Sequence, residues 1–250
     1  MKTYRFFHAG KGFTLMETLL AIALVSVLVS MFITVFLPAR AVVLNALNKQ
    51  DAERITSILR TEMSTLKPNE IATAGATRST AGQYVSAFDK AFMWMQRSDR
   101  PSRSIVIFSY RADTSKAPRA DGSFPALPLG KSAPNFNSQL VSIACPMDDP
   151  IHKNDIRDAV GSVFLVRMTQ LVPDPMTGGY REAGSPGIIQ EASDPSAYVS
   201  NEKDRDAWGG AVFYRADFYL MRPANPARYR NRSWKQLGEP CFSANLSFRR

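Results

Sequence analysis

The sequence Lys-Gly-Phe-Thr-Leu-Met-Glu-Thr at residues 11–18 leads directly into an apolar stretch that carries no further charge before Arg40. Residues 18–37 alone are 20 uncharged residues, and a helix of that length covers about 30 Å, the thickness of a bilayer core. Glu17 therefore stands at the start of a membrane-length helix. A carboxylate in such a helix is costly, so one that is not neutralised indicates a function.

Positive charges flank this stretch on both sides, with more of them before it than after it. Lys2, Arg5 and Lys11 precede it, and Arg40 follows it. Lysine and arginine favour the cytoplasmic side of a bilayer, so we expect a cytoplasmic N-terminus and an exported C-terminal body.

Three interpretations of the N-terminal segment compete. The first is a plain signal anchor, in which Glu17 and the Gly–Phe junction have no special role. The second is a cleaved secretory signal, because Ala39-Arg40-Ala41 has the A-x-A form of a cleavage site and would leave Val42 as the first residue. However, the apolar region is much longer than the roughly 7–15 residues usual in such signals.

The third interpretation is a prepilin signal, and it rests on a resemblance. The residues Gly12-Phe13-Thr14-Leu15-Met16-Glu17 resemble the cleavage and methylation motif of the type IV prepilin family, which includes the pseudopilins of type II secretion. The resemblance implies that prepilin peptidase cuts after Gly12 and methylates the new N-terminus on Phe13. It also implies an assembly role for Glu17, because the fifth residue of mature chains in this family is glutamate.

The chemistry of the motif is consistent with these roles. Gly12 has no side chain, so an extended backbone can lie flat in a protease cleft. In a filament like those of the family, Glu17 of one subunit would neutralise the new amine of Phe13 on a neighbour. An unpaired charge in an apolar bundle costs several kcal/mol, so this pairing would fix the register of assembly. In an isolated subunit, we expect the unneutralised carboxylate of Glu17 to be unfavourable.

The helix is expected to continue beyond the apolar stretch, with a bend or local disruption at Pro38, to a total length of about 50 residues. Lys67-Pro68-Asn69 is a credible stop. An amphipathic i, i+3, i+4 pattern covers the last part, at Ile55, Ile58, Leu59, Met63 and Leu66. The expected organisation is a leader (1–12), a transmembrane or filament-core helix (13–37), its amphipathic continuation (38–67) and an exported globular domain (68–250).

The sequence after residue 68 predicts an α+β domain. A short helix is expected at Ala87 to Gln96, and loops rich in proline and glycine separate runs of β-branched and aromatic residues. One long helix followed by strands favours a helix packed on a mostly antiparallel sheet, which is also the pilin-like fold that the resemblance implies. The predicted strands are Ser104–Tyr110, Gln139–Cys145, Ser162–Val172, Ala211–Arg222 and Phe242–Phe248.

The two cysteines, Cys145 and Cys241, each lie at the edge of a predicted strand. Export would place them in an oxidising compartment, so they are candidates for a disulfide bond, with two unpaired thiols as the alternative. Pilin-like proteins often carry a C-terminal disulfide. There is no C-x-x-C motif and no cysteine–histidine cluster, so a structural zinc site is not expected.

A weak indication of calcium binding comes from an acidic loop. Asp204 and Asp206 lie in an acidic loop that could offer oxygen ligands to calcium, as some pseudopilins do. Their spacing is not that of an EF-hand, and a solvated acidic loop is the favoured interpretation. We therefore expect no bound metal and no cofactor.

Positive charge is moderate and concentrated near the C-terminus. The formal net charge is +9 and falls to +6 (9 − 3) without the leader. Interleaved arginines and aromatics can hold phosphates and stack bases, but a charged face or a subunit-docking surface is favoured over nucleic-acid binding. The residues concerned are Arg222, Arg228, Tyr229, Arg230, Arg232, Trp234 and Lys235.

Catalysis has no positive support in the sequence. His152 is the one histidine beyond the leader, and its context reads as a loop. No G-x-S-x-G, H-E-x-x-H or P-loop motif is present. We therefore expect this chain not to be an enzyme.

Together these features predict a minor pilin or pseudopilin, a structural subunit of a type IV pilus or of a type II secretion-like filament. The expected partners are prepilin peptidase, other pilin-like subunits, an inner-membrane assembly platform and the lipid bilayer. Before assembly, the chain would sit in the bacterial inner membrane with its domain in the periplasm. The alternative is a membrane-tethered periplasmic binding module or enzyme with a signal anchor.

Overall fold

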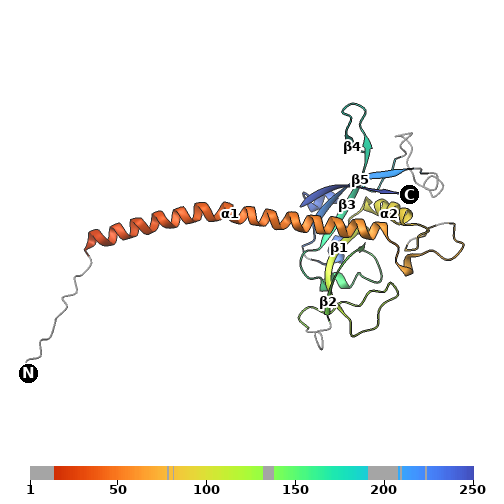
Figure 1. The fold of residues 1–250 in the computed structure, drawn as a ribbon, viewed down its shortest axis with the longest axis horizontal. Coiled ribbons are helices and arrows are strands. Elements are labelled where there is room, and N and C mark those ends of the chain that lie inside the picture. Colours follow the sequence, from red (N-terminus) through yellow and green to blue (C-terminus); the bar gives the residue numbers. More distant parts are fainter. Residues whose placement is uncertain are drawn as a thin grey trace, which may run out of the picture. The chain divides into compact units, whose positions relative to one another are not determined.

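The computed structural model describes residues 14–77, 79–80, 82–131, 138–190, 208, 210–222 and 224–250. Contacts within the chain divide it into two compact units, Met1–Asp51 and Ala52–Arg250. The long helix α1 (Leu15–Ser64) belongs to both units, and the other helices and strands belong to the second (Figure 1).

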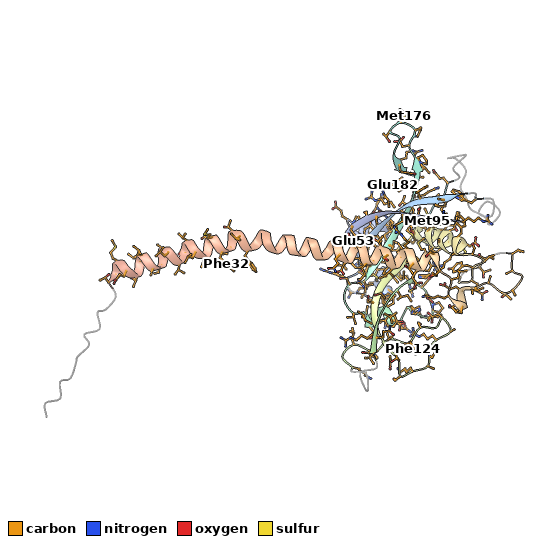
Figure 2. The ribbon with its side chains drawn as sticks, viewed as in Figure 1. Phe32, Glu53, Met95, Phe124, Met176 and Glu182 are labelled. Carbon is orange, nitrogen blue, oxygen red and sulfur yellow. The ribbon has the colours of Figure 1, made fainter. Side chains whose placement is uncertain are left out.

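The described part of the first unit is the apolar portion of α1. The segment Leu15–Phe36 has a mean hydropathy of 2.8 and buries none of its residues within the chain. It is therefore long and apolar enough to cross a membrane. Phe32 illustrates its exposed side chains in Figure 2. The helix continues through Pro38 to a total of 50 residues, as expected, but it is not interrupted there, so the local disruption predicted at Pro38 is wrong.

The last part of α1 belongs to the second unit and is amphipathic, as predicted. Ile55, Leu59 and Met63 are buried, and Ile58 and Leu66 pack against the same cluster with partial exposure. The four positions within α1 lie one, three or four residues apart, so they share one face of the helix, and Leu66 follows just after its end.

The second unit is built on a six-stranded sheet in which every strand pair is antiparallel. The strand order is β2-β1-β3-β5-β6, and β4 pairs with β3. The α+β class is therefore confirmed, and the five predicted strands are present with ends shifted by at most three residues. Their bounds are β1 Ile105–Asp113, β2 Ser138–Pro146, β3 Phe164–Pro173, β4 Tyr180–Glu182, β5 Ala211–Leu220 and β6 Phe242–Arg249.

One face of the sheet is covered by helices, and we call it the helix face. Ile107, Val166 and Phe218 point to this face and pack with the buried residues of α1 and of α2 (Ala87–Gln96). Helix α2 begins where predicted, because the hydroxyl oxygen of Ser86 accepts the backbone N–H of Asp89 at 3.1 Å.

The opposite face is covered by loops and short 3₁₀ turns, and we call it the loop face. Strand residues alternate between the two faces, so Val106, Leu165 and Tyr219 point here. The covering turns are η4 (Asp155–Asp158), η5 (Pro226–Tyr229) and η6 (Trp234–Leu237).

A buried lysine joins the end of α1 to α2. The Nζ of Lys90 donates to Glu70 Oε2 at 2.6 Å and to the backbone oxygen of Thr65 at 2.9 Å, and it lies 4.7 Å from the ring centroid of Trp94. Burial lowers the pKa of Lys90, and Glu70 offsets part of that effect. The contact with Thr65 places the positive charge of Lys90 next to the C-terminal end of α1, where the helix dipole favours a cation.

Strand β4 was not predicted from the sequence. It has three exposed residues and forms a hairpin with the end of β3. Figure 2 shows Met176 at the tip of this hairpin, where it is 91% exposed.

Candidate functional site

Glu17 lies in the first turn of α1 and forms a capping box with Thr14. Its Oε2 accepts the backbone N–H of Thr14 at 2.9 Å and the Thr14 hydroxyl at 3.1 Å, and its own N–H donates to Thr14 Oγ1 at 3.3 Å. Thr14 therefore supplies hydrogen bonds to Oε2 but no counter-charge, and the pairing of Glu17 with a neighbouring subunit stays a prediction. No hydrogen bond from another described residue reaches Oε1. Gly12 and Phe13, the predicted cleavage and methylation residues, lie outside the described residues.

Three hydroxyl side chains in the apolar segment are satisfied within the helix itself. Ser26, Ser30 and Thr34 each donate to the carbonyl four residues earlier, at 2.8, 2.8 and 2.7 Å. Their polar hydrogens therefore need no partner from lipid or from another chain.

The structure does not contain the candidate disulfide. Cys145 and Cys241 are both free thiols, the first buried and the second exposed. Cys145 pairs with Val106 near the end of β2, whereas the N–H of Cys241 bonds to Phe218 beside β6. These strands form opposite ends of the order β2-β1-β3-β5-β6, four spacings of about 4.8 Å apart. Disulfide geometry needs Cα atoms about 4.4–6.8 Å apart, so this pairing is wrong for the folded chain.

Asp204 and Asp206, the calcium candidates, lie outside the described residues. Within the part of the chain that the structure describes, no group of three or more histidine, cysteine, aspartate or glutamate side chains is placed to hold a metal ion. Trp208 is described, and its ring packs edge-on against Phe92 in the helix-face cluster.

The aromatic residues of the basic C-terminal segment are structural. Tyr229 and Trp234 are buried in the loop-face cluster, and the indole N–H of Trp234 donates to the backbone oxygen of Ser98 at 2.7 Å. Neither ring is free to stack on a base, so the reason for considering nucleic acid is weakened. Arg228, Arg230 and Lys235 from the same segment remain exposed.

His152 is not a loop-surface residue but the centre of a buried ionic cluster, formed by Arg119, Asp121, His152 and Asp155. Its Nε2 lies 2.7 Å from Asp121 Oδ2, and its Nδ1 lies 3.1 Å from Asp155 Oδ2. Arg119 makes a bidentate contact with Asp155, at 2.9 Å through Nη2 to Oδ1 and more closely through Nη1 to Oδ2. Because both ring nitrogens face carboxylates, neither is free to accept a proton from a nucleophile.

The ionic cluster favours charged forms of its members. Burial alone would lower the pKa of His152, but hydrogen bonds with Asp155 and Asp121 outweigh it and raise that pKa above its ordinary value. Burial opposes ionisation of Asp155 as well, yet Arg119 and His152 lower its pKa to about 2. The cluster joins the loop after β1, which carries Arg119 and Asp121, to the segment of residues 148–158.

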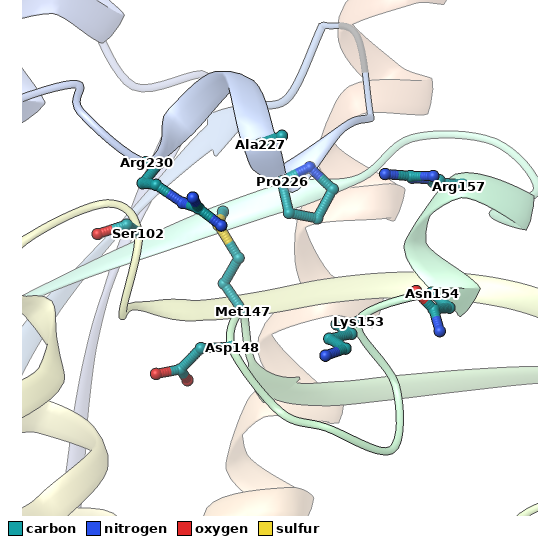
Figure 3. A pocket seen from close by; sticks show the side chains of 9 residues that line it. All are labelled: Ser102, Met147, Asp148, Lys153, Asn154, Arg157, Pro226, Ala227 and Arg230. Atoms are coloured by element: carbon teal, nitrogen blue, oxygen red, sulfur yellow. The ribbon is translucent and has the colours of Figure 1, made fainter.

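A pocket of about 370 Å³ is lined in part by that segment (Figure 3). The end of β2 and the η4 region supply Met147, Lys153 and Arg157, and the η5 region supplies Pro226 and Arg230. We call it the cationic pocket, because Lys153, Arg157 and Arg230 all line it. None of these three makes an ion pair with another described residue.

The cationic pocket was not predicted from the sequence. Arg230 was noted only as part of the basic segment, and the partner loop was noted only for its histidine. The four-residue spacing of Lys153 and Arg157, just after His152, was the one available signal. No pattern in the sequence indicates that this loop lies near η5, which is about 70 residues later in the chain.

The chain was compared with known proteins, and no family model, no curated protein and no solved structure matches it.

Proposed function

We propose that this chain is a pilin-like structural subunit that prepilin peptidase cleaves after Gly12 and methylates on Phe13. It is then stored in the bacterial inner membrane with its α+β domain in the periplasm. From there an inner-membrane assembly platform incorporates it, through α1, into a filament of other pilin-like subunits. The size and long loops of the domain favour a minor or tip-proximal position, because a bulky domain is difficult to stack densely.

The observation that carries this proposal is the composition of α1. One unbroken helix of 50 residues begins with an acidic residue in its first turn, continues as a membrane-length apolar segment and ends by packing on an antiparallel sheet. A simple anchor requires only the apolar segment. It explains neither the position of Glu17 nor the continuous amphipathic extension.

The capping box refines the proposed role of Glu17. Thr14 occupies only Oε2, so Oε1 is available to accept the amine of Phe13 from a neighbouring subunit. Before assembly, the capping box lowers the cost of placing this carboxylate at the membrane boundary. On assembly, a second, charged donor can be added without breaking the first contact.

Mass spectrometry of the mature N-terminus tests the processing step. A chain that begins with methylated Phe13 supports the proposal. A chain that retains Met1 in cells that possess prepilin peptidase would overturn it and would favour the membrane-tethered binding module. A chain that begins at Val42 would identify a released secretory protein.

The substitution Glu17→Val tests the assembly step. We expect unchanged recovery in the membrane fraction and a loss of incorporation into filaments of at least about tenfold, because an amine would be left unpaired in an apolar bundle. Glu53→Val is the matched control, since Glu53 is an exposed acid on the same helix beyond the apolar segment. Equal incorporation of Glu17→Val and Glu53→Val would contradict the proposed role of Glu17.

A further inference from the structure

The cationic pocket combines positive charge with an apolar base. Met147 is buried at the end of β2, and Pro226 and Ala227 line the η5 side. Lys153 and Arg157 approach from the facing segment, and Arg230 from beyond η5 (Figure 3). Three like charges around one concave site repel each other, so the site is better satisfied by an anion than by water alone.

The acidic side chain in the lining does not neutralise these cations. Asp148 forms an ion pair with Arg97, which lies outside the lining. In the part of the chain that the structure describes, Lys153, Arg157 and Arg230 have neither a carboxylate partner nor a hydrogen bond from their side chains. The lining therefore carries three uncompensated positive charges.

The segment that carries Lys153 and Arg157 is anchored by the ionic cluster, because it also carries His152 and Asp155. His152 contacts Asp121, and Asp155 contacts Arg119. Lys153, directly after His152, and Arg157, two residues after Asp155, are exposed and line the pocket. The backbone adds further bonds, from Lys153 N–H to Asp149 oxygen at 3.0 Å and from Arg157 N–H to Asn154 oxygen at 3.2 Å. A site supported in this way loses less freedom when it binds.

We propose that the cationic pocket binds a compact phosphate-bearing ligand. A phosphate monoester carries close to two negative charges and three acceptor oxygens, which suits three separate cations better than a single carboxylate does. Two arginines can each offer a planar pair of donors to such a group, and Lys153 adds a compact charge. The volume is within the range of small-molecule sites, and the apolar base would contact the carbon portion of the ligand.

This inference does not depend on filament assembly. The pocket lies entirely in the second unit, and its charge and shape are the same whether α1 serves as an assembly helix or as a membrane anchor.

Isothermal titration calorimetry with inorganic pyrophosphate tests the proposal, with the full chain in non-ionic detergent at a constant ionic strength of about 0.1 M. We expect one binding site per chain. Arg230→Ala and Lys153→Ala should each weaken binding at least about tenfold. Their matched controls, Arg228→Ala and Lys235→Ala, remove exposed cations that do not line the pocket and should change the affinity less than about twofold.

Three results would overturn the proposal: no binding by the unaltered chain, equal weakening by the pocket and control variants, or tighter binding of citrate than of pyrophosphate. All four substituted side chains are exposed, so an unchanged melting temperature will show that lost binding is not lost folding. Dioctanoyl phosphatidic acid binding that is lost in Arg230→Ala and kept in Arg228→Ala would identify a lipid headgroup. Binding of glycerol 3-phosphate alone would identify a soluble ester, and both of these results support the proposal.

Discussion

The two faces of the sheet are covered in different ways. On the helix face, α2 and the last part of α1 bury a continuous cluster of aliphatic and aromatic side chains, including Leu59 and Trp94. On the loop face, 3₁₀ turns and long loops bury a second apolar cluster, and beside it lies the ionic cluster centred on His152. The first covering is regular and mainly apolar, with one buried lysine, Lys90, paired with Glu70, and the second is irregular and partly ionic.

Because the two coverings differ, the dependence of conformational stability on pH should differ between the two faces. Burial of apolar area is insensitive to pH, so the aliphatic and aromatic cluster of the helix face should keep its contribution over a wide range. The ion pair of Lys90 with Glu70 beside that cluster is the exception, because it requires a protonated amine. Ion pairs between buried groups exist only while both partners are charged, so the loop face should respond to pH. The cationic pocket lies on the pH-sensitive side.

The largest expected effect is on the helix face. Leu59→Ala removes a fully buried side chain and should lower the free energy of unfolding by about 2–5 kcal/mol, by the same amount at about pH 6 and about pH 8.5. Urea unfolding of the full chain in detergent, followed by tryptophan fluorescence, measures it. Leu28→Ala on the exposed apolar segment is the control and should change the free energy of unfolding by less than about 0.5 kcal/mol.

The second-largest loss of unfolding free energy is expected on the loop face, from Asp155→Asn. This change leaves the guanidinium of Arg119 without its carboxylate partner and removes one of two acceptors of His152, so we expect a loss of about 2–3 kcal/mol near neutral pH. Asp158→Asn removes a carboxylate that, among the described residues, accepts only the N–H of Leu129, and it should cost less than about 1 kcal/mol. A similar loss in both variants would mean that the ionic cluster adds no stability of its own.

The unaltered chain should show a pH dependence of smaller size. The pKa of His152 is raised in the folded state, so its contribution is complete below about pH 6.5 and is lost as the pH rises through the folded-state pKa. The pKa of Asp155 is lowered to about 2, so its contribution is complete above about pH 3.8 and is lost as the pH falls toward 2. Unfolding free energies at about pH 6 and about pH 8.5 should therefore differ, with the higher value at pH 6.

His152→Gln provides the control for that dependence. It removes the titrating ring, so the difference between the two pH values should shrink while the free energy at the lower pH falls. An undiminished difference would assign the pH dependence to other groups.

The smallest effect should come from a single cap on the helix face. Ser86→Ala removes the acceptor of the Asp89 N–H at the start of α2 and should cost about 1 kcal/mol, independent of pH in the same range. The melting temperature of the full chain measures it. Ser86→Thr retains the capping oxygen and the hydroxyl that donates to Asp89 Oδ2 at 2.8 Å, so it should recover most of the loss.

Much of the fold could be predicted because its elements carry local patterns. Alternating or continuous apolar runs marked β1, β2, β3, β5 and β6, and the spacing of Ile55, Leu59 and Met63 marked the packed face of α1. Strand β4 could not be predicted, because it has three exposed residues within a stretch rich in proline and glycine and exists only by pairing with β3.

The residues that tertiary contacts bring together were less predictable. Nothing local to His152 indicates that Asp121, about 30 residues earlier, reaches its ring, and nothing local to Arg230 indicates Lys153. The disulfide prediction failed because compartment and strand-edge position do not reveal strand order. The capping box was readable as Thr14-x-x-Glu17, but the family resemblance directed attention to an intermolecular partner instead.

The contrast between the two thiols offers a direct way to determine membrane sidedness. Burial raises the pKa of Cys145 well above its ordinary value, so this thiol is inert, whereas Cys241 is exposed. A maleimide that cannot cross a bilayer should therefore attach once per natural chain, at Cys241. In intact spheroplasts, labelling would place the α+β domain outside the cytoplasm without any engineered residue.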